Sequence, residues 1–204
     1  MGFVNPQYAL PHTRRKVFIS YFRGDHVEVE AFVNWWGRML DAFIPLIVGA
    51  CGNDVIKSEN ADYVIGKIRR EQIADSTVTM VLMGKCTHSR RHVDWKTKAS
   101  LAQGEDRTPN GLLGIVLPSN GGGAPLPPRF AANWQAGNQG GYARYYIAPK
   151  TPDKMRAWIE DAFWARTTRA HLIENRREMM GYNSKCQICG ITHSRANSIP
   201  LPPR

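Results

Sequence analysis

TVTMVLMG, residues 77–84, is the clearest strand signal in this chain of 204 residues. It is a short apolar run with β-branched residues, and it ends at a glycine. An apolar run without alternating polar residues is typical of a strand that is buried on both faces. Such strands occur in parallel sheets that carry helices on each side, so further strands and amphipathic helices are expected before and after it.

Four other runs have strand character. KVFISY (16–21) and GLLGIVLP (111–118) predict buried strands. IPLIVG (44–49) predicts a strand at a sheet edge, because Pro45 lacks the N–H that a central strand needs. ARYYIAP (143–149) predicts a late strand.

Apolar residues at helical spacing predict helices between these strands. The first set follows residues 16–21 and comprises Val29, Phe32, Val33, Trp36, Leu40 and Phe43. A second set predicts a helix that runs to about Ala74 and comprises Val64, Ile65 and Ile68. Ser89 is expected to cap a third helix, which runs to Gln103 and ends at Gly104.

The last helix is expected to begin with Thr151 as its cap and Pro152 in its first turn. Its apolar stripe comprises Met155, Trp158, Ile159, Ala162 and Phe163. CGNDVIKSEN (51–60) and SNGGGAPLPPR (119–129) predict loops. The order of elements therefore predicts one α/β domain, a parallel sheet with helices on both faces.

Ligands of such sheets bind beyond the carboxyl ends of the strands, where the strand order reverses. The turn FRGDH (22–26) is one candidate, and it predicts a nucleotide cradle with Arg23 on phosphate. The cradle residues are Phe22, Arg23, Gly24 and Asp25. The alternative interpretation is a turn in which Asp25 caps the next helix. The second candidate turn is GKCTHSRRHVDW (84–95).

The net charge of +10 arises from 27 Lys and Arg against 17 Asp and Glu, and it favours anionic partners. The basic residues are scattered in short groups rather than gathered in one dense stripe, so a solvated surface is favoured over direct nucleic-acid binding. No apolar run approaches 18 residues, which predicts no membrane span. The first residues lack a secretory signal, and the four cysteines are too few for a disulfide scaffold. We therefore expect the protein to lie in the reducing environment of the cytoplasm.

The segment KVFISYFRGD resembles the opening of TIR and TIR-like domains. A longer set is similar to the Thoeris ThsB-type TIR-like family of bacterial anti-phage defence; it comprises KIRREQIADSTVTMVLMG, RRHVDWKTKASL, GLLGIVLP, LPPRF and GYARYY. The resemblance covers about residues 15–185 and implies a flavodoxin-like (TIR-like) fold. We expect an N-terminal extension (1–14), a TIR-like domain (15–180) and a C-terminal tail (181–204).

For active family members the resemblance implies cleavage of the nicotinamide–ribose bond of NAD and formation of an ADP-ribose-type signal. A glutamate in a W-x-x-x-E pattern serves that reaction. In this chain the matching segment runs from His92 to Lys96, so the acid has become a base. A lysine places positive charge beside a developing positive charge and opposes the reaction. Asp94 is a possible substitute, although it lies about 200° around the helix from Lys96.

His92 and Lys96 share one helix face and follow Arg90 and Arg91. This basic helix start predicts phosphate binding without cleavage, as part of the site for NAD or a related nucleotide. The alternative interpretation is an exposed, charged helix face.

Cys186 and Cys189 form a CxxCG motif, and His193 follows it, which resembles half of a zinc site. The fourth ligand would be His171, if the tail folds back, or a residue of another subunit. Two free thiols are the alternative interpretation. Cys51 and Cys86 are interpreted as ordinary core or loop residues. The terminal NSIPLPPR (197–204) is expected to be extended.

Three functions are consistent with these patterns. The favoured one is a TIR-like defence protein that acts as a sensor, scaffold or partner subunit, in a homo- or hetero-oligomer with a Thoeris effector or a paralogous TIR protein. The second is an active NAD-cleaving enzyme that uses Asp94, or Glu59 or Glu105 brought in by assembly. The third is a basic nucleic-acid-binding module.

Overall fold

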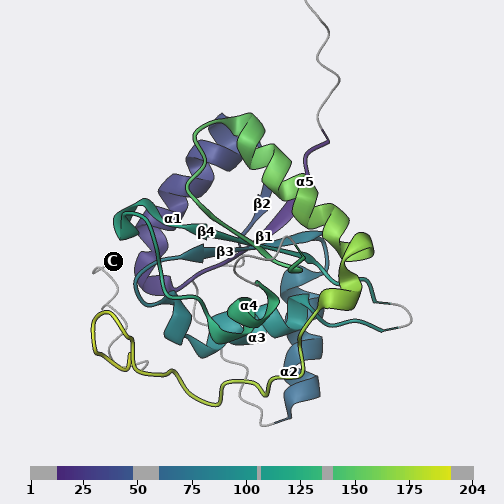
Figure 1. Ribbon diagram of the computed structural model, residues 1–204, viewed down its shortest axis with the longest axis vertical. Coiled ribbons are helices and arrows are strands. Elements are labelled where there is room, and N and C mark those ends of the chain that lie inside the picture. Colours follow the sequence, from purple (N-terminus) through teal and green to yellow (C-terminus); the bar gives the residue numbers. More distant parts are fainter. Residues whose placement is uncertain (1–12, 48–59, 105–106, 135–139, 194–204) are drawn as a thin grey trace, which may run out of the picture.

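The computed structural model describes residues 13–47, 60–104, 107–134 and 140–193. Within these ranges five parallel strands form one sheet in the order β2-β1-β3-β4-β5 (Figure 1). They are β1 (Lys16–Ser20), β2 (Ile44–Leu46), β3 (Val78–Met83), β4 (Gly111–Val116) and β5 (Arg144–Ile147). Every strand expected from the sequence is confirmed, with the proline-containing β2 at an edge. The strand order is that of flavodoxin-like folds.

Helices connect and cover the strands. They are α1 (His26–Val33), α2 (Ala61–Ile68), α3 (Arg91–Ser100), α4 (Pro128–Asn133) and α5 (Pro152–Thr168). α1 and α2 continue into π-helical segments, η2 (Asn34–Met39) and η3 (Arg69–Ile73). Short 3₁₀ turns complete the order; they are η1 (Arg23–Asp25), η4 (Thr87–Ser89), η5 (Pro118–Asn120) and η6 (Ala170–Leu172).

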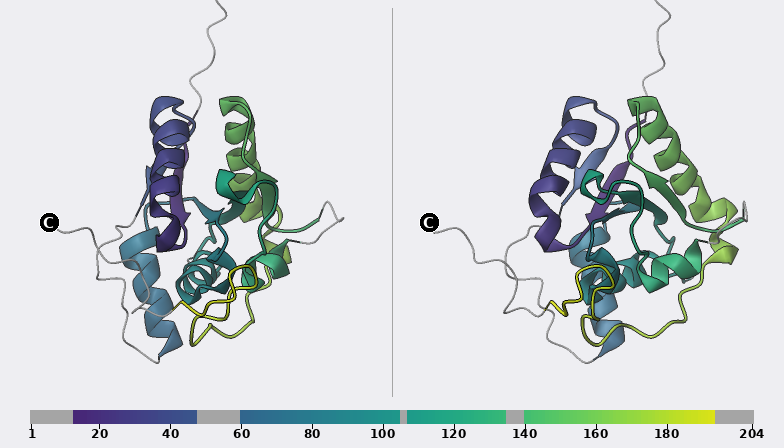
Figure 2. Two further views of the ribbon diagram at one scale, coloured as in Figure 1. Left: turned by 90° about the vertical axis from the view of Figure 1, so that its left-hand side faces the viewer. Right: turned by 60° about the vertical axis from the view of Figure 1, so that its left-hand side comes forward.

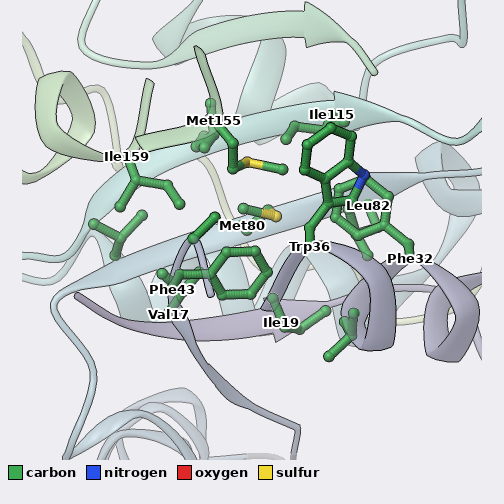
Figure 3. Close-up of a cluster of buried hydrophobic side chains, with 14 of the residues drawn as sticks. Val17, Ile19, Phe32, Trp36, Phe43, Met80, Leu82, Ile115, Met155 and Ile159 are labelled. Atoms are coloured by element: carbon green, nitrogen blue, oxygen red, sulfur yellow. The ribbon is translucent and has the colours of Figure 1, made fainter. Parts of the chain in front are cut away.

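The sheet lies between two helical layers. α1 and α5 cover one face, and α2, α3 and α4 cover the other (Figure 2). Alternate residues of β3 serve the two layers: Met80 and Leu82 pack with α1 and α5, whereas Val81 and Met83 pack towards α3 and α4. Figure 3 shows the first cluster, with labelled side chains Val17, Ile19, Phe32, Trp36, Phe43, Met80, Leu82, Ile115, Met155 and Ile159.

Two helix predictions are confirmed in detail. Thr151 caps α5, because its Oγ1 accepts a hydrogen bond from the Lys154 amide at 3.3 Å. The second helix ends within a residue of the expected Ala74. In contrast, the first apolar stripe extends beyond its helix. The chain turns at Asp41, whose φ is 52°, and Phe43 reaches the core just before β2.

The limits expected for the third helix are wrong at both ends. Arg90, not Ser89, occupies the N-cap position, and the Ser89 hydroxyl donates to the Cys86 carbonyl at 2.9 Å. The helix ends at Ser100 because the Ser100 carbonyl accepts a hydrogen bond from the Asn110 amide, while the Gly104 amide donates to Arg107. An α-helix that reached Gly104 would need the bond from Gly104 to Ser100 instead.

The loop predicted for residues 119–129 ends earlier than expected, because α4 begins at Pro128. Proline suits this first helical position, where its missing N–H would have had no partner. The loop predicted for residues 51–60 lies outside the described residues except for Asn60. The segment 197–204, which is expected to be extended, also lies outside them. Within the described ranges, no helix combines the length and apolar character that crossing a membrane requires.

Candidate functional site

The strand order reverses between β1 and β3, and the turns that follow these two strands meet at the carboxyl edge of the sheet. Thr87, in the turn after β3, donates its hydroxyl to Asp25 Oδ2 at 3.4 Å. A methyl group at Gly84 would overlap the Asp25 carboxylate, so the absence of a side chain there lets the two turns approach. The two turns identified from the sequence are therefore brought together.

Asp25 occupies the N-cap position of α1, but its side chain makes no capping hydrogen bond and faces Gly84 and Thr87. Burial raises the pKa of Asp25 to about 6, the Thr87 hydroxyl opposes the rise, and the nearby charge of Glu28 adds to it. Glu28 itself accepts hydrogen bonds from the amide and hydroxyl of Ser119, both at 2.7 Å. This edge thus carries a carboxyl group whose protonation changes just below neutral pH.

The other residues of the expected cradle differ in their surroundings. Phe22 is covered: the Arg90 guanidinium lies 4.5 Å from its ring centroid, and the His193 ring packs edge-on at 5.3 Å. Arg23 and Gly24 are exposed. Arg23 is the cradle side chain that the structure leaves open to an anionic ligand.

Lys96 and His92 of α3 each contact an aromatic ring. Lys96 is half-buried, and its Nζ lies 5.8 Å from the centroid of the Phe18 ring on β1. His92 packs edge-on against Trp95, with ring centroids 5.6 Å apart. These contacts place Lys96 between α3 and the sheet.

Asp94 points to a different neighbour. It is 1 % exposed, and its carboxylate accepts hydrogen bonds from Arg129 Nε and from the Met180 amide, at 2.9 and 3.0 Å. Both contacts fasten α3 to other parts of the chain, to α4 through Arg129 and to the segment after α5 through Met180. The surroundings of Asp94 are those of a structural residue.

Residues 174–193, called here the C-terminal strap, run along α3 and η4 without regular secondary structure (Figures 1 and 2). The Trp95 indole donates to the Met180 carbonyl at 2.9 Å, and the Ser184 amide donates to the Ser89 carbonyl at 3.0 Å. Farther along, the Gln187 amide donates to His88 Nε2 at 3.1 Å. The described part of the expected tail therefore packs against the domain.

The strap carries the CxxCG motif to the turn after β3. The sulfur atoms of Cys86, Cys186 and Cys189 all lie within 4.8 Å of one another, and Cys86 Sγ is 3.5 Å from Cys189 Sγ. His193 Nε2 is 3.3 Å from Cys189 Sγ. Thiolates and imidazoles are the usual ligands of zinc, so this group of side chains could hold such an ion.

Cys86 is the member that sequence reasoning missed. The sequence predicts an ordinary core or loop residue at Cys86 and offers His171 as a fourth ligand. The structure places His171 at the surface in η6, and it places Cys86 beside Cys189, 103 residues away in sequence. The one available signal was the position of Cys86 in the turn after β3, and this signal does not reveal where the strap runs.

The surroundings of the cysteines affect their acidity in opposite directions. Burial, together with the neighbouring thiols, raises the pKa of Cys86 to about 12. Burial also opposes ionisation of Cys186, but amide groups of Cys189 and Ile188 donate to its sulfur and bring its pKa below the usual value. Burial and the charge of Arg90 lower the pKa of His193, which favours the neutral imidazole that a metal needs.

Comparison with known protein families gives a match over the sheet. The family described as Thoeris protein ThsB, TIR-like domain, matches residues 18–121, slightly more than half of the chain. The matched part contains most of β1, all of β2, β3 and β4, and both turns at the carboxyl edge. No curated protein matches the sequence. The chain belongs to the TIR-like domain family of the Thoeris protein ThsB and is a TIR-like protein of anti-phage defence.

Proposed function

We propose that this protein serves Thoeris defence as a sensor, scaffold or partner subunit that binds a nucleotide without the usual NAD cleavage. The observation that carries the proposal is Lys96, a cation at the position where the resemblance implies a catalytic glutamate. Its partners would be NAD or a related nucleotide, and a Thoeris effector or a paralogous TIR protein within an oligomer.

Charge is the physical reason for the loss of cleavage. As nicotinamide leaves, positive charge develops on the ribose, and a nearby carboxylate stabilises it. An ammonium group in the same place raises the energy of that transition state. The contact of Lys96 with the Phe18 ring stabilises the ammonium where it is, since aromatic faces attract cations.

Asp94 does not offer a replacement in this conformation. Moving it towards the carboxyl edge would break its hydrogen bonds with Arg129 and Met180 and would leave a buried guanidinium without its counter-charge. Such a loss costs about 3–5 kcal/mol, which a nucleotide would have to supply on binding.

Nucleotide binding is supported by the exposed cation Arg23 at the carboxyl edge, close to the first turn of α1. Phosphate oxygens accept charge-assisted hydrogen bonds from guanidinium groups, and helix N-termini add favourable dipoles. His92 and Lys96 supply further basic groups from α3.

A second candidate is an NAD-cleaving enzyme, and the position of Asp25 favours it. Asp25 lies at the edge where ligands of such sheets bind, and burial raises its pKa to about 6. A carboxylate here could hold a ribose hydroxyl or stabilise developing positive charge. Glu59 and Glu105, the other acids considered from the sequence, lie outside the described residues. The nucleic-acid alternative rests on the net charge of +10 alone.

The deciding experiment measures nicotinamide release from NAD by chromatography, with the protein concentrated enough to assemble. The parent is compared with Lys96→Glu, Asp25→Asn and the control Lys154→Glu, which makes the same charge change on the exposed start of α5. We expect release from Lys96→Glu alone. Release from the parent that Asp25→Asn abolishes would establish the second candidate instead.

Binding is measured separately by calorimetry with NAD and with ADP-ribose. We expect Arg23→Ala to weaken the affinity about tenfold, as expected for the loss of one charge-assisted hydrogen bond. An affinity unchanged by Arg23→Ala would remove Arg23 from the site. Tight binding of single-stranded DNA with a steep salt dependence would instead favour the nucleic-acid function.

A further inference from the structure

We propose that Cys86, Cys186, Cys189 and His193 bind one Zn²⁺ ion, which fastens the C-terminal strap to the turn after β3. The sequence motif alone supplies three of these ligands, and the tertiary structure supplies the fourth. Such an ion would be bound whether or not the protein cleaves or binds NAD.

The three sulfur atoms are already grouped closely enough to share one tetrahedral zinc ion. Zinc–sulfur bonds of about 2.3 Å place two sulfur ligands about 3.8 Å apart, and a sulfur and a nitrogen ligand about 3.6 Å apart. The observed separations are 3.5 Å between Cys86 Sγ and Cys189 Sγ, and 3.3 Å between Cys189 Sγ and His193 Nε2. The three sulfur atoms need only small movements to surround the ion, and the His193 ring, which lies beside Cys189, would turn towards the other two sulfur atoms to complete the site.

The backbone around the motif forms a tight turn. The Cys189 amide lies 3.5 Å from Cys186 Sγ and points its N–H at the sulfur. The Gly190 amide donates to the Cys186 carbonyl at 2.9 Å, and Gly190 has a φ of 71°, which favours glycine. Amide donors near a ligand stabilise the thiolate and fix the ligand orientation.

Arg90 supplies the balancing charge. Three thiolates and a neutral imidazole around Zn²⁺ carry a net charge of about −1. The Arg90 side chain is 4 % exposed, and it donates to the Cys86 carbonyl at 3.0 Å and to the His193 carbonyl at 3.2 Å. A buried cation that holds the backbone of two ligands is expected beside an anionic metal centre and costs more to bury without one.

The ion would also determine one wall of the carboxyl edge. His193 packs against Phe22, and Phe22 directly precedes Arg23 and Gly24 at the start of η1. Fixing His193 to the metal therefore fixes the surface beside the β1 turn. The site is structural rather than catalytic, because four protein ligands leave no open position for substrate.

Zinc content tests the proposal directly. The full chain is purified without added metal and with any affinity tag removed, and its zinc is measured by elemental mass spectrometry. We expect about one zinc per chain, as a site with three thiolate ligands and one imidazole ligand holds its ion through purification. Cobalt(II) added to chelator-treated protein should give the visible absorption bands of tetrahedral thiolate coordination.

Variants identify the ligands. Cys189→Ser, at an exposed position, and Cys86→Ser should each reduce the zinc content to near zero and abolish the tetrahedral cobalt spectrum. Cys51→Ser is the matched control, because Cys51 is the remaining cysteine of the four in the chain, and it should keep full zinc content. Chelation should increase hydrogen exchange at residues 184–193 and leave β3 protected.

Three results would overturn the assignment. In the first, the chain contains no zinc and gives no tetrahedral cobalt spectrum. In the second, the Cys86→Ser variant retains full zinc content. In the third, two of these cysteines form a disulfide in protein purified under reducing conditions. The first and third exclude a metal centre, and the second confines the site to the tail.

Discussion

Asp94 and Arg129 form a buried ion pair that joins α3 to α4. Arg129 Nε lies 2.9 Å from Asp94 Oδ1, and Arg129 Nη2 lies 3.3 Å from Asp94 Oδ2. The side chain of Arg129 is 0 % exposed and that of Asp94 is 1 % exposed. The remaining donors of Arg129 bind the strap, at the backbone and side chain of Asn175 and at the Glu178 carbonyl. All five N–H groups of the guanidinium are thereby used.

This pair predicts a large effect of Asp94→Asn on stability. The substitution keeps the shape of the side chain but leaves the Arg129 charge buried without a counter-ion. We expect the free energy of unfolding to fall by about 3 kcal/mol, measured by urea denaturation at neutral pH.

Glu30→Gln is the matched control for Asp94→Asn. Glu30 pairs with His26 at the surface of α1, where the same carboxyl-to-amide change should cost less than about 0.5 kcal/mol. Equal small effects at both positions would show that the buried pair contributes little. The double variant Asp94→Leu with Arg129→Met should lose less stability than the sum of its single changes.

Gly111→Ala tests the contact between β4 and α5. A methyl group at Gly111 would overlap the carbonyl oxygen of Ala162, and neither backbone can move without disturbing the sheet or the helix. We expect a loss of about 3 kcal/mol in the free energy of unfolding. Gly122→Ala is the control, since a methyl group there meets nothing within 4 Å and should leave stability nearly unchanged. A mild effect of Gly111→Ala would mean that α5 sits less closely on the sheet.

Asp25 predicts a dependence of stability on pH. Its pKa is about 6 in the folded protein against 3.8 for the free side chain, so the folded state binds the proton more tightly. The resulting stabilisation is complete below about pH 4 and is lost as the pH rises through 6. Relative to Asp25→Asn, the parent should therefore lose on the order of 1 kcal/mol between pH 4 and pH 7, after allowance for screening by solvent.

Urea denaturation of the parent and Asp25→Asn at several pH values measures this difference. Glu28→Gln provides the complementary test, because it removes a negative charge that raises the pKa of Asp25. An NMR titration of the Asp25 carboxyl should then show a lower midpoint than in the parent. A midpoint near 4 in the parent would contradict the burial of Asp25 against Gly84.

The strands and the larger helices could be predicted because their signals are local. An apolar run such as residues 77–84 and a cap such as Thr151 are each written within a few residues. The end of α3 could not be predicted in this way. It is determined by a hydrogen bond from Asn110, which reaches Ser100 only once β4 lies beside β3.

The sequence by itself determined the fold class, the family and the two turns that form the carboxyl edge, since these depend on hydrophobic periodicity and on short motifs. The tertiary structure alone decided that Asp94 is held by Arg129 and that Cys86 meets Cys189. Both contacts depend on the path of segments whose sequence carries little periodic signal: the loop that leads into the short helix α4, and the C-terminal strap. A segment of that kind is positioned by hydrogen bonds to distant parts of the chain, and no local pattern of residues specifies where those partners lie.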